Sequence, residues 1–212
     1  MPAVSDDLRS RFVVAAFAEI SFGLLGIFLG WWIGPSTHTH IPHLTNLERI
    51  AEGVILGTCL GAVLAAAVFA LSHAPIRGLR DLQEMMETRL AEFLIPMSRA
   101  ELVVLSMAAG IGEELLFRGW LQQGLFAFLG AEKSLWMGLL GLLLASLLFG
   151  LAHPITPLYI VLATGMGGFL GGIYWMTGNL LCAITAHAVY DAVILLKWHH
   201  DMKHKDLESD RS

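Results

Sequence analysis

Residues 100–128 read AELVVLSMAAGIGEELLFRGWLQQGLFAF, a long apolar stretch that contains two adjacent glutamates and an arginine. A membrane-spanning helix needs about 20 mostly apolar residues, and this stretch is long enough to be one. Ionised groups are costly in the hydrocarbon layer, so Glu113, Glu114 and Arg118 call for a functional explanation. The stretch therefore predicts a membrane helix that carries chemically active side chains.

The composition of the whole chain also predicts a membrane protein. Of its 212 residues, 56% are hydrophobic and only 15% are charged, and the mean hydropathy is +0.66. A soluble domain would have about a quarter of its residues charged. Apolar blocks recur along the chain, which predicts an all-α, polytopic membrane helix bundle with about six transmembrane helices. The six predicted spans are residues 12–34, 50–71, 100–128, 134–152, 156–177 and 179–197.

A further helix is predicted between the second and third spans. From residue 79 to residue 94 the apolar side chains recur at steps of three and four, as on one face of an amphipathic helix. Such a helix is suited to the headgroup region of a membrane. We expect a single structural domain with three parts: an N-terminal two-span region with this interfacial helix (1–99), a catalytic core (100–197) and a polar cytoplasmic tail (198–212).

Lysine and arginine are distributed unevenly over the two sides that six spans define. Ten of them fall on the side that holds both termini, and the other side holds only Arg49 and Lys133. Because Lys and Arg are enriched in cytoplasmic segments, both termini are expected in the cytoplasm. The small size and the lack of a long cytoplasmic extension favour a prokaryotic plasma membrane.

Within the third span, helical geometry separates the three charged side chains. Glu114 and Arg118 share a face, with the acid N-terminal to the base, which is the better order for an ion pair. Glu113 is rotated by about 100° from Glu114 and stays free to act as a general base toward water. The alternative is an ion-pair network that only holds helices together, but buried pairs seldom add net stability.

Two histidines lie in later spans. His153 follows Phe149 by one helical turn at the end of the fourth span, and Pro154 breaks that helix. His187 and Asp191 lie one turn apart in the sixth span, so Asp191 is expected either to orient the imidazole or to face the same ligand or oxyanion. Taken alone, each histidine is also compatible with a structural role in a buried hydrogen bond or at the interface.

The three motifs Glu113-Glu114-xxx-Arg118, Phe149-xxx-His153 and His187-xxx-Asp191 occur in order, each on its own predicted span. In this respect residues 100–195 resemble the CPBP family of intramembrane peptidases, which includes CAAX prenyl endopeptidases and Abi-type bacteriocin-processing or self-immunity proteins. The resemblance implies a membrane-embedded protease, of glutamate type or metallo type, that acts on membrane-associated or lipidated substrates. It implies that the catalytic residues are Glu113, Glu114, His153, His187 and Asp191, with Arg118 and Phe149 as structural support of the site.

In the roles that the resemblance implies, Glu113 and His153 activate the attacking water, and His187 and Asp191 position the substrate carbonyl or stabilise the oxyanion. The family often has asparagine at the position of Asp191, and an ionised carboxylate has no hydrogen to donate to an oxyanion. Glu113, His153 and His187 could also bind one zinc ion, because two histidines and a carboxylate form a known catalytic ligand set. No His-Glu-x-x-His element demands a metal, so the expected cofactor is either none or a single zinc ion.

Two other function classes are compatible with these residues. Buried Glu, His and Asp side chains also serve proton-coupled transporters and channels, and a non-catalytic immunity or scaffold protein would keep the same fold. The chain has no phosphate-binding loop and no basic–aromatic cluster, so no nucleic-acid partner is expected. The expected partners are a peptide or protein substrate and the lipid bilayer, and the oligomeric state is left open. Glu19, deep in the first span, is a further candidate for the substrate path.

Overall fold

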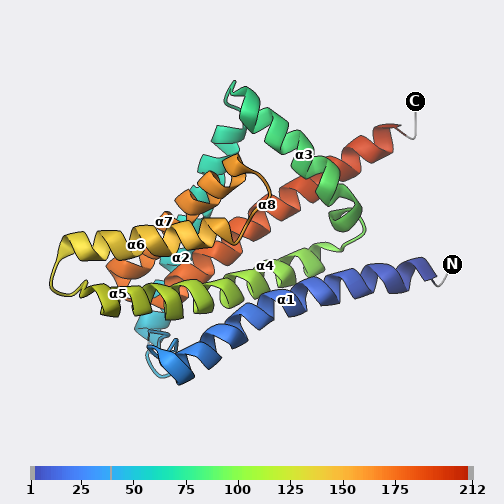
Figure 1. Cartoon of the computed structure of the whole chain (residues 1–212). Helices are drawn as coiled ribbons and strands as arrows, with labels where there is room; N and C mark the ends of the chain where they lie inside the picture. The colour runs from blue at the N-terminus through green and yellow to red at the C-terminus, as the bar shows by residue number, and fades with distance from the viewer. Residues whose placement is uncertain (1–2, 39, 210–212) are drawn as a thin grey trace.

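The computed structural model describes residues 3–38 and 40–209, and in these residues the chain is helical and contains no strand. Figure 1 shows long helices packed side by side, with the start of α1 and the end of α8 toward the same end of the bundle. The last residues of the predicted tail, 210–212, lie outside the described residues. The elements in chain order are α1 (Ala3–Ile33), α2 (Leu47–Ser72), α3 (Arg77–Leu94), α4 (Arg99–Glu114), the π-helical segment η1 (Leu115–Gln122), α5 (Gln123–Leu129), α6 (Leu135–Leu151), α7 (Pro157–Thr177) and α8 (Leu180–Ser209).

The predicted polytopic helical bundle is confirmed, and a helix occupies each of the six predicted spans. Among the described residues, four segments are long and apolar enough to cross a membrane: Ser10–Ile33, Leu47–Ser72, Pro157–Thr177 and Leu180–His204. Helix α6 is apolar but has only 17 residues, which gives it a length of about 25 Å. The continuous helix formed by α4, η1 and α5 carries the charged motif. For α6 and for α4–η1–α5, the crossing of the membrane stays a prediction.

The third predicted span begins at a defined cap and changes its helical type in the middle. The Ser98 side chain accepts a hydrogen bond from the backbone of Glu101, and the Glu101 carboxylate accepts one from the backbone of Ser98. This capping box satisfies amide groups at the start of α4. Directly after Glu114, the α-helix becomes the π-helix η1, which the hydrophobic pattern did not predict. π-Helical turns are rare and are often found at functional sites.

Small residues allow the helices around η1 to pack closely. A methyl group added at Gly110 of α4 would come within 2.9 Å of the Cβ atom of Ala188 in α8. Small side chains let backbones approach where lipid gives no hydrophobic drive for association. In α7, Gly167 and Gly171 pack tightly against neighbouring helices, whereas a methyl group at Gly165 would meet nothing within 4 Å. The close approach of α4 and α8 is the contact that positions the site.

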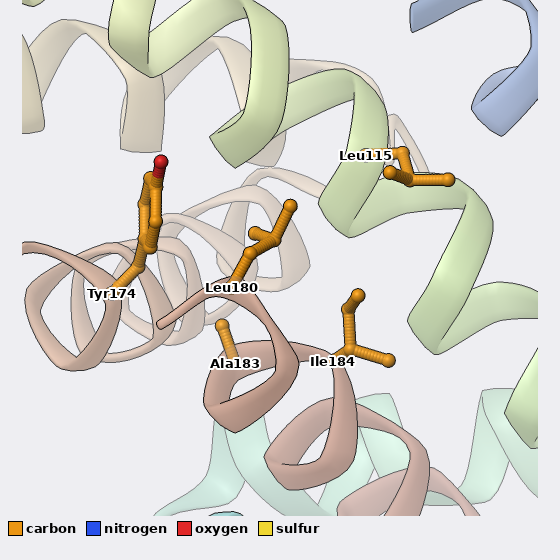
Figure 2. Packing of buried hydrophobic residues seen from close by; sticks show 5 residues of the cluster. All are labelled: Leu115, Tyr174, Leu180, Ala183 and Ile184. Carbon is orange, nitrogen blue, oxygen red and sulfur yellow. The ribbon is translucent and has the colours of Figure 1, made fainter. Parts of the chain in front are cut away.

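A buried apolar cluster packs η1 against α7 and α8. Figure 2 shows Leu115 of η1 reaching toward the first turns of α8, with Tyr174 of α7 beside them. Burial of such side chains helps to fix how η1, which continues the helix of Glu114, faces α8, which carries His187. The members of this cluster are Leu115, Tyr174, Leu180, Ala183 and Ile184.

The predicted amphipathic helix is present as α3, and its position in the headgroup region stays a prediction. Leu79, Met86 and Leu94 of its apolar face are buried. Figure 1 shows α3 running from the end of α2 toward the start of α4, across the C-terminal part of α8. At its end, Leu94 and Met97 pack with Met202 of α8 in one buried cluster. Helix α3 therefore covers one end of the bundle.

Candidate active site

The ionisable residues singled out in the sequence meet between α4, the end of α6 and α8. Glu113 and Glu114 are the last two residues of α4, and both are buried, with 7% and 0% of their surface exposed. His153 follows α6, and His187 lies in α8 with 2% of its surface exposed. The Asp191 side chain, one turn further along α8, is 23% exposed. Three separate segments of the chain thus place these groups in one buried region.

Glu114 connects Arg118 to His187. Its Oε1 atom accepts hydrogen bonds from Arg118 Nη1 at 2.7 Å and from His187 Nδ1 at 2.9 Å. An ionised carboxylate only accepts hydrogen bonds, so Nδ1 of His187 carries a proton and Nε2 is the nitrogen turned away from Glu114. Sequence spacing suggested Asp191 as one possible group to orient this imidazole. The contact at Nδ1 instead belongs to Glu114, on another helix, which no local spacing could have indicated.

Arg118 is fully enclosed and held from three sides. Besides its ion pair with Glu114, its Nη2 atom donates a hydrogen bond to the backbone oxygen of Gly167 at 3.1 Å. Its guanidinium carbon lies 4.4 Å from the centre of the Phe149 ring, in a cation–π contact. Arg118 therefore joins η1 to α6 and α7 and fixes the Glu114 carboxylate. The role of Arg118 and Phe149 as structural support of the site, which the resemblance implies, stays a prediction.

Glu113 faces both histidines without a direct hydrogen bond to either. Its Oε1 atom lies 3.6 Å from His153 Nε2, and its Oε2 atom lies 4.0 Å from His187 Nε2. His153 Nδ1 donates a hydrogen bond to the backbone oxygen of Phe149 at 2.8 Å, which turns Nε2 toward Glu113. Within the described part of the chain, the buried Oε2 atom of Glu113 has no hydrogen-bond partner. Glu113 is thus the carboxylate left free to bind another group.

Asp191 and Phe149 complete the surroundings of the histidines. Asp191 Oδ2 lies 3.5 Å from His187 Nε2, so this nitrogen is placed between Asp191 and Glu113. The Phe149 ring is 1% exposed, and its centre lies 4.8 Å from that of His153 and 6.1 Å from that of His187. The ring therefore forms an apolar wall beside both imidazoles.

The site opens into a cavity of about 780 Å³ that reaches well beyond the predicted catalytic core. Helices α2 and α3, from the N-terminal region, form much of its wall together with α7 and α8. No chemical signal in the sequence indicated this contribution, since most of these residues are ordinary apolar side chains. Tyr159 and Tyr190 also line the cavity and did not stand out in the sequence. The site residues in the lining are Glu113, Phe149, His153, His187 and Asp191.

Glu19 of α1 lies close to the end of α4 that carries Glu113. Gly112, directly before Glu113, packs against the backbone oxygen of Glu19, and any side chain at position 112 would collide with it. The Glu19 Oε2 atom is buried and has no hydrogen-bond partner among the residues described. Glu19 is therefore near the catalytic helix but is absent from the cavity wall that the described residues form.

The three predicted metal ligands fit zinc in chemical type and approximately in separation. In residues 3–38 and 40–209, no three His, Cys, Asp or Glu side chains are gathered tightly enough to form a ready metal site. Ligand atoms around a tetrahedral zinc ion lie about 3.3–3.6 Å apart, compared with 3.6 and 4.0 Å from Glu113 to the two histidines. Both Nδ1 atoms are already bound, to Glu114 and to Phe149, as in zinc sites with outer-shell partners. The two separations from Glu113 are thus equal to or longer than those of a formed zinc site.

Comparison with known proteins agrees with the motifs. Residues 95–193 match the family model described as type II CAAX prenyl endopeptidase Rce1-like. The matched segment covers nearly half of the chain and contains every site residue named above, and it is consistent with the resemblance to CPBP intramembrane proteases. The match supports a CAAX-type intramembrane endopeptidase in general terms. No protein with a curated description and no solved structure matches the chain significantly.

Proposed function

Because residues 95–193 carry the signature of the Rce1-like type II CAAX prenyl endopeptidases, we propose that this integral membrane protein hydrolyses peptide bonds of lipidated or other membrane-associated polypeptides. One observation carries the proposal: Glu113, His153, His187 and Asp191 converge from three segments on the wall of one cavity. The uneven distribution of Lys and Arg supports cytoplasmic termini.

Glu113 is the proposed general base. A water molecule held by its free Oε2 atom and by His153 Nε2 would lose a proton to the carboxylate while its oxygen attacks the scissile carbonyl carbon. The tetrahedral intermediate then collapses, the carbon–nitrogen bond breaks, and the proton held by Glu113 passes to the leaving amine. The buried setting favours this chemistry because charges interact more strongly away from bulk water.

His187 is the proposed partner of the substrate oxygen. Its Nδ1 atom is held by Glu114, so its Nε2 atom points in a fixed direction toward Glu113 and Asp191. An N–H group at Nε2 would donate a hydrogen bond to the developing oxyanion, which is the strongest single contribution in many acyl-transfer sites. Asp191 would fix the ring from the Nε2 side or hold the substrate amide.

A zinc-dependent variant of the mechanism uses the same residues. Glu113, His153 and His187 would hold the ion, which when bound would supply a Lewis acid and lower the pKa of bound water. Glu114 would then keep its contact with His187 Nδ1, and Arg118 would keep Glu114 in place. To separate the two subtypes, cleavage and bound metal are measured together after treatment with a chelator. Full cleavage by metal-free protein would remove the zinc variant.

The proposal is tested with purified protein in lipid vesicles and a prenylated CAAX peptide. Replacing Glu113→Gln removes the base at nearly constant volume, and we expect kcat to fall roughly 10²- to 10⁴-fold. Glu132→Gln, in the exposed connection between α5 and α6, serves as the matched control and should cleave like the wild type. Unchanged cleavage by the Glu113 variant would contradict the mechanism. Proton or solute flux that depends on Glu113, without cleavage, would favour a transporter instead.

A further inference from the structure

The cavity that contains the site has an acidic floor and a basic mouth. Its lining is mostly apolar, and the buried floor carries Glu113 and His187. The lining residues that are exposed to solvent include Arg80 and Lys197, which therefore lie at the mouth. A ligand that fills the cavity thus meets the carboxylates and imidazoles of the site at one end, and Arg80 and the Lys197–Asp201 ion pair at the other.

Of the two basic side chains in the lining, Lys197 is already neutralised. Its Nζ atom lies 2.8 Å from Asp201 Oδ2, and it lies 4.9 Å from the centre of the Phe69 ring. Arg80 has no ion-pair or hydrogen-bond partner anywhere in the described part of the chain. Its charge is therefore available to an external group.

The position of Arg80 on α3 explains how it reaches the mouth. Leu79, Gln83, Met86 and Leu90 of α3 line the cavity, and on a helix they share one face. Arg80 lies at the edge of this face, next to Gln83, where its aliphatic stem can pack on apolar surface while the guanidinium stays in water. The turn before it is anchored, because a methyl group at Gly78 would lie 3.5 Å from Leu158 at the start of α7.

We propose that Arg80 binds the C-terminal carboxylate of the substrate and thereby restricts cleavage to bonds close to a free chain end. This inference rests on the proposed peptidase function and names the chemical group that the cavity selects. A carboxylate would be repelled by Glu113 and Asp191 at the floor and attracted by the guanidinium, which matches carboxylate geometry with paired donors. A CAAX sequence ends the polypeptide, and three extended residues span only about 10 Å. Glu113 and Arg80 line the same cavity, so the scissile bond and the chain end would lie in it together.

The test compares two prenylated peptides that end in Cys-Val-Ile-Ala, one with a free carboxylate and one with a C-terminal carboxamide. The full-length protein is assayed in phosphatidylcholine vesicles, and kcat/KM is measured for both. For the wild type we expect the acid to be cleaved about tenfold better, since a hydrogen-bonded ion pair at an exposed site gives about this factor. In Arg80→Gln the ratio of acid to amide should fall close to one. Arg80→Lys, which keeps the charge, should keep part of the preference.

Arg89→Gln is the matched control, because Arg89 is exposed on the same helix and lies half a turn around it from Arg80. It should keep the wild-type ratio of acid to amide. An Arg80→Gln variant that keeps this ratio would overturn the inference. The inference is also overturned if Arg80→Gln lowers kcat/KM equally for the acid and the amide, and does so only in vesicles that contain phosphatidylglycerol. Arg80 would then bind a lipid headgroup. A wild type that cleaves both peptides equally refutes only the role of Arg80, whereas one that cleaves neither refutes the proposed function as well.

Discussion

Removing the charge of Glu114 tests whether this residue acts through His187 or only through packing. In Glu114→Gln, Arg118 would remain buried with 2% of its side chain exposed and without its charged partner. Breaking a buried ion pair from one side costs about 3–5 kcal/mol of stability. The charge-assisted hydrogen bond to His187 Nδ1, now 2.9 Å long, would also be lost, at about 1.5–3 kcal/mol. If the hydrogen bond between Glu114 and His187 stabilises the transition state, its loss lowers kcat roughly ten- to hundredfold or more.

The double variant Glu114→Gln with Arg118→Met separates the two effects. Replacing both members of a buried pair leaves no uncompensated charge, so the stability should return to within about 1 kcal/mol of the wild type. His187 still lacks its carboxylate, so kcat should stay low while KM changes little. The measurements are thermal unfolding in detergent and steady-state cleavage of a prenylated peptide. Wild-type activity in the double variant would refute the role of Glu114 in orienting His187.

Three further predictions follow from the site. Gly110→Val should abolish cleavage by forcing α4 away from Ala188 in α8. Gly165→Ala is the control and should cleave like the wild type, because the added methyl group meets no neighbour within 4 Å. Cleavage assays on both folded variants check this. Asp191→Asn should keep its activity within about tenfold of the wild type, because an amide still forms hydrogen bonds, whereas Asp191→Ala should lose roughly 10²-fold or more. An alanine variant more active than the asparagine variant would contradict a hydrogen-bonding role for Asp191. Dialysis against a chelator should leave the free energy of unfolding unchanged if no metal is bound, and should lower it if Glu113, His153 and His187 hold zinc.

The sequence predicted the type and order of the helices well because each prediction depends on local properties. Apolar stretches of sufficient length and the steps of three and four from residue 79 to residue 94 require no knowledge of neighbours. The ion pair of Glu114 with Arg118 also follows from spacing within one turn, and it is present at 2.7 Å. The π-helical turn at Leu115–Gln122 was missed, since it arises from tertiary packing around Arg118 and Gln122, whose side chains bond to backbone oxygens of α7.

By itself, the sequence determined which chemical groups enter the membrane helices and in what order. Burying a charge is costly, so each ionisable residue within an apolar stretch can be recognised without knowledge of its neighbours in space. Tertiary structure alone decided which of these groups meet across different helices. The angle and distance at which α4 meets α8, set by contacts such as that between Gly110 and Ala188, place Glu114 at Nδ1 of His187 and leave Glu113 facing Nε2. The same packing brings α3 over the cavity and Arg80 to its mouth. Such contacts join residues far apart in the chain, and no local pattern encodes their geometry.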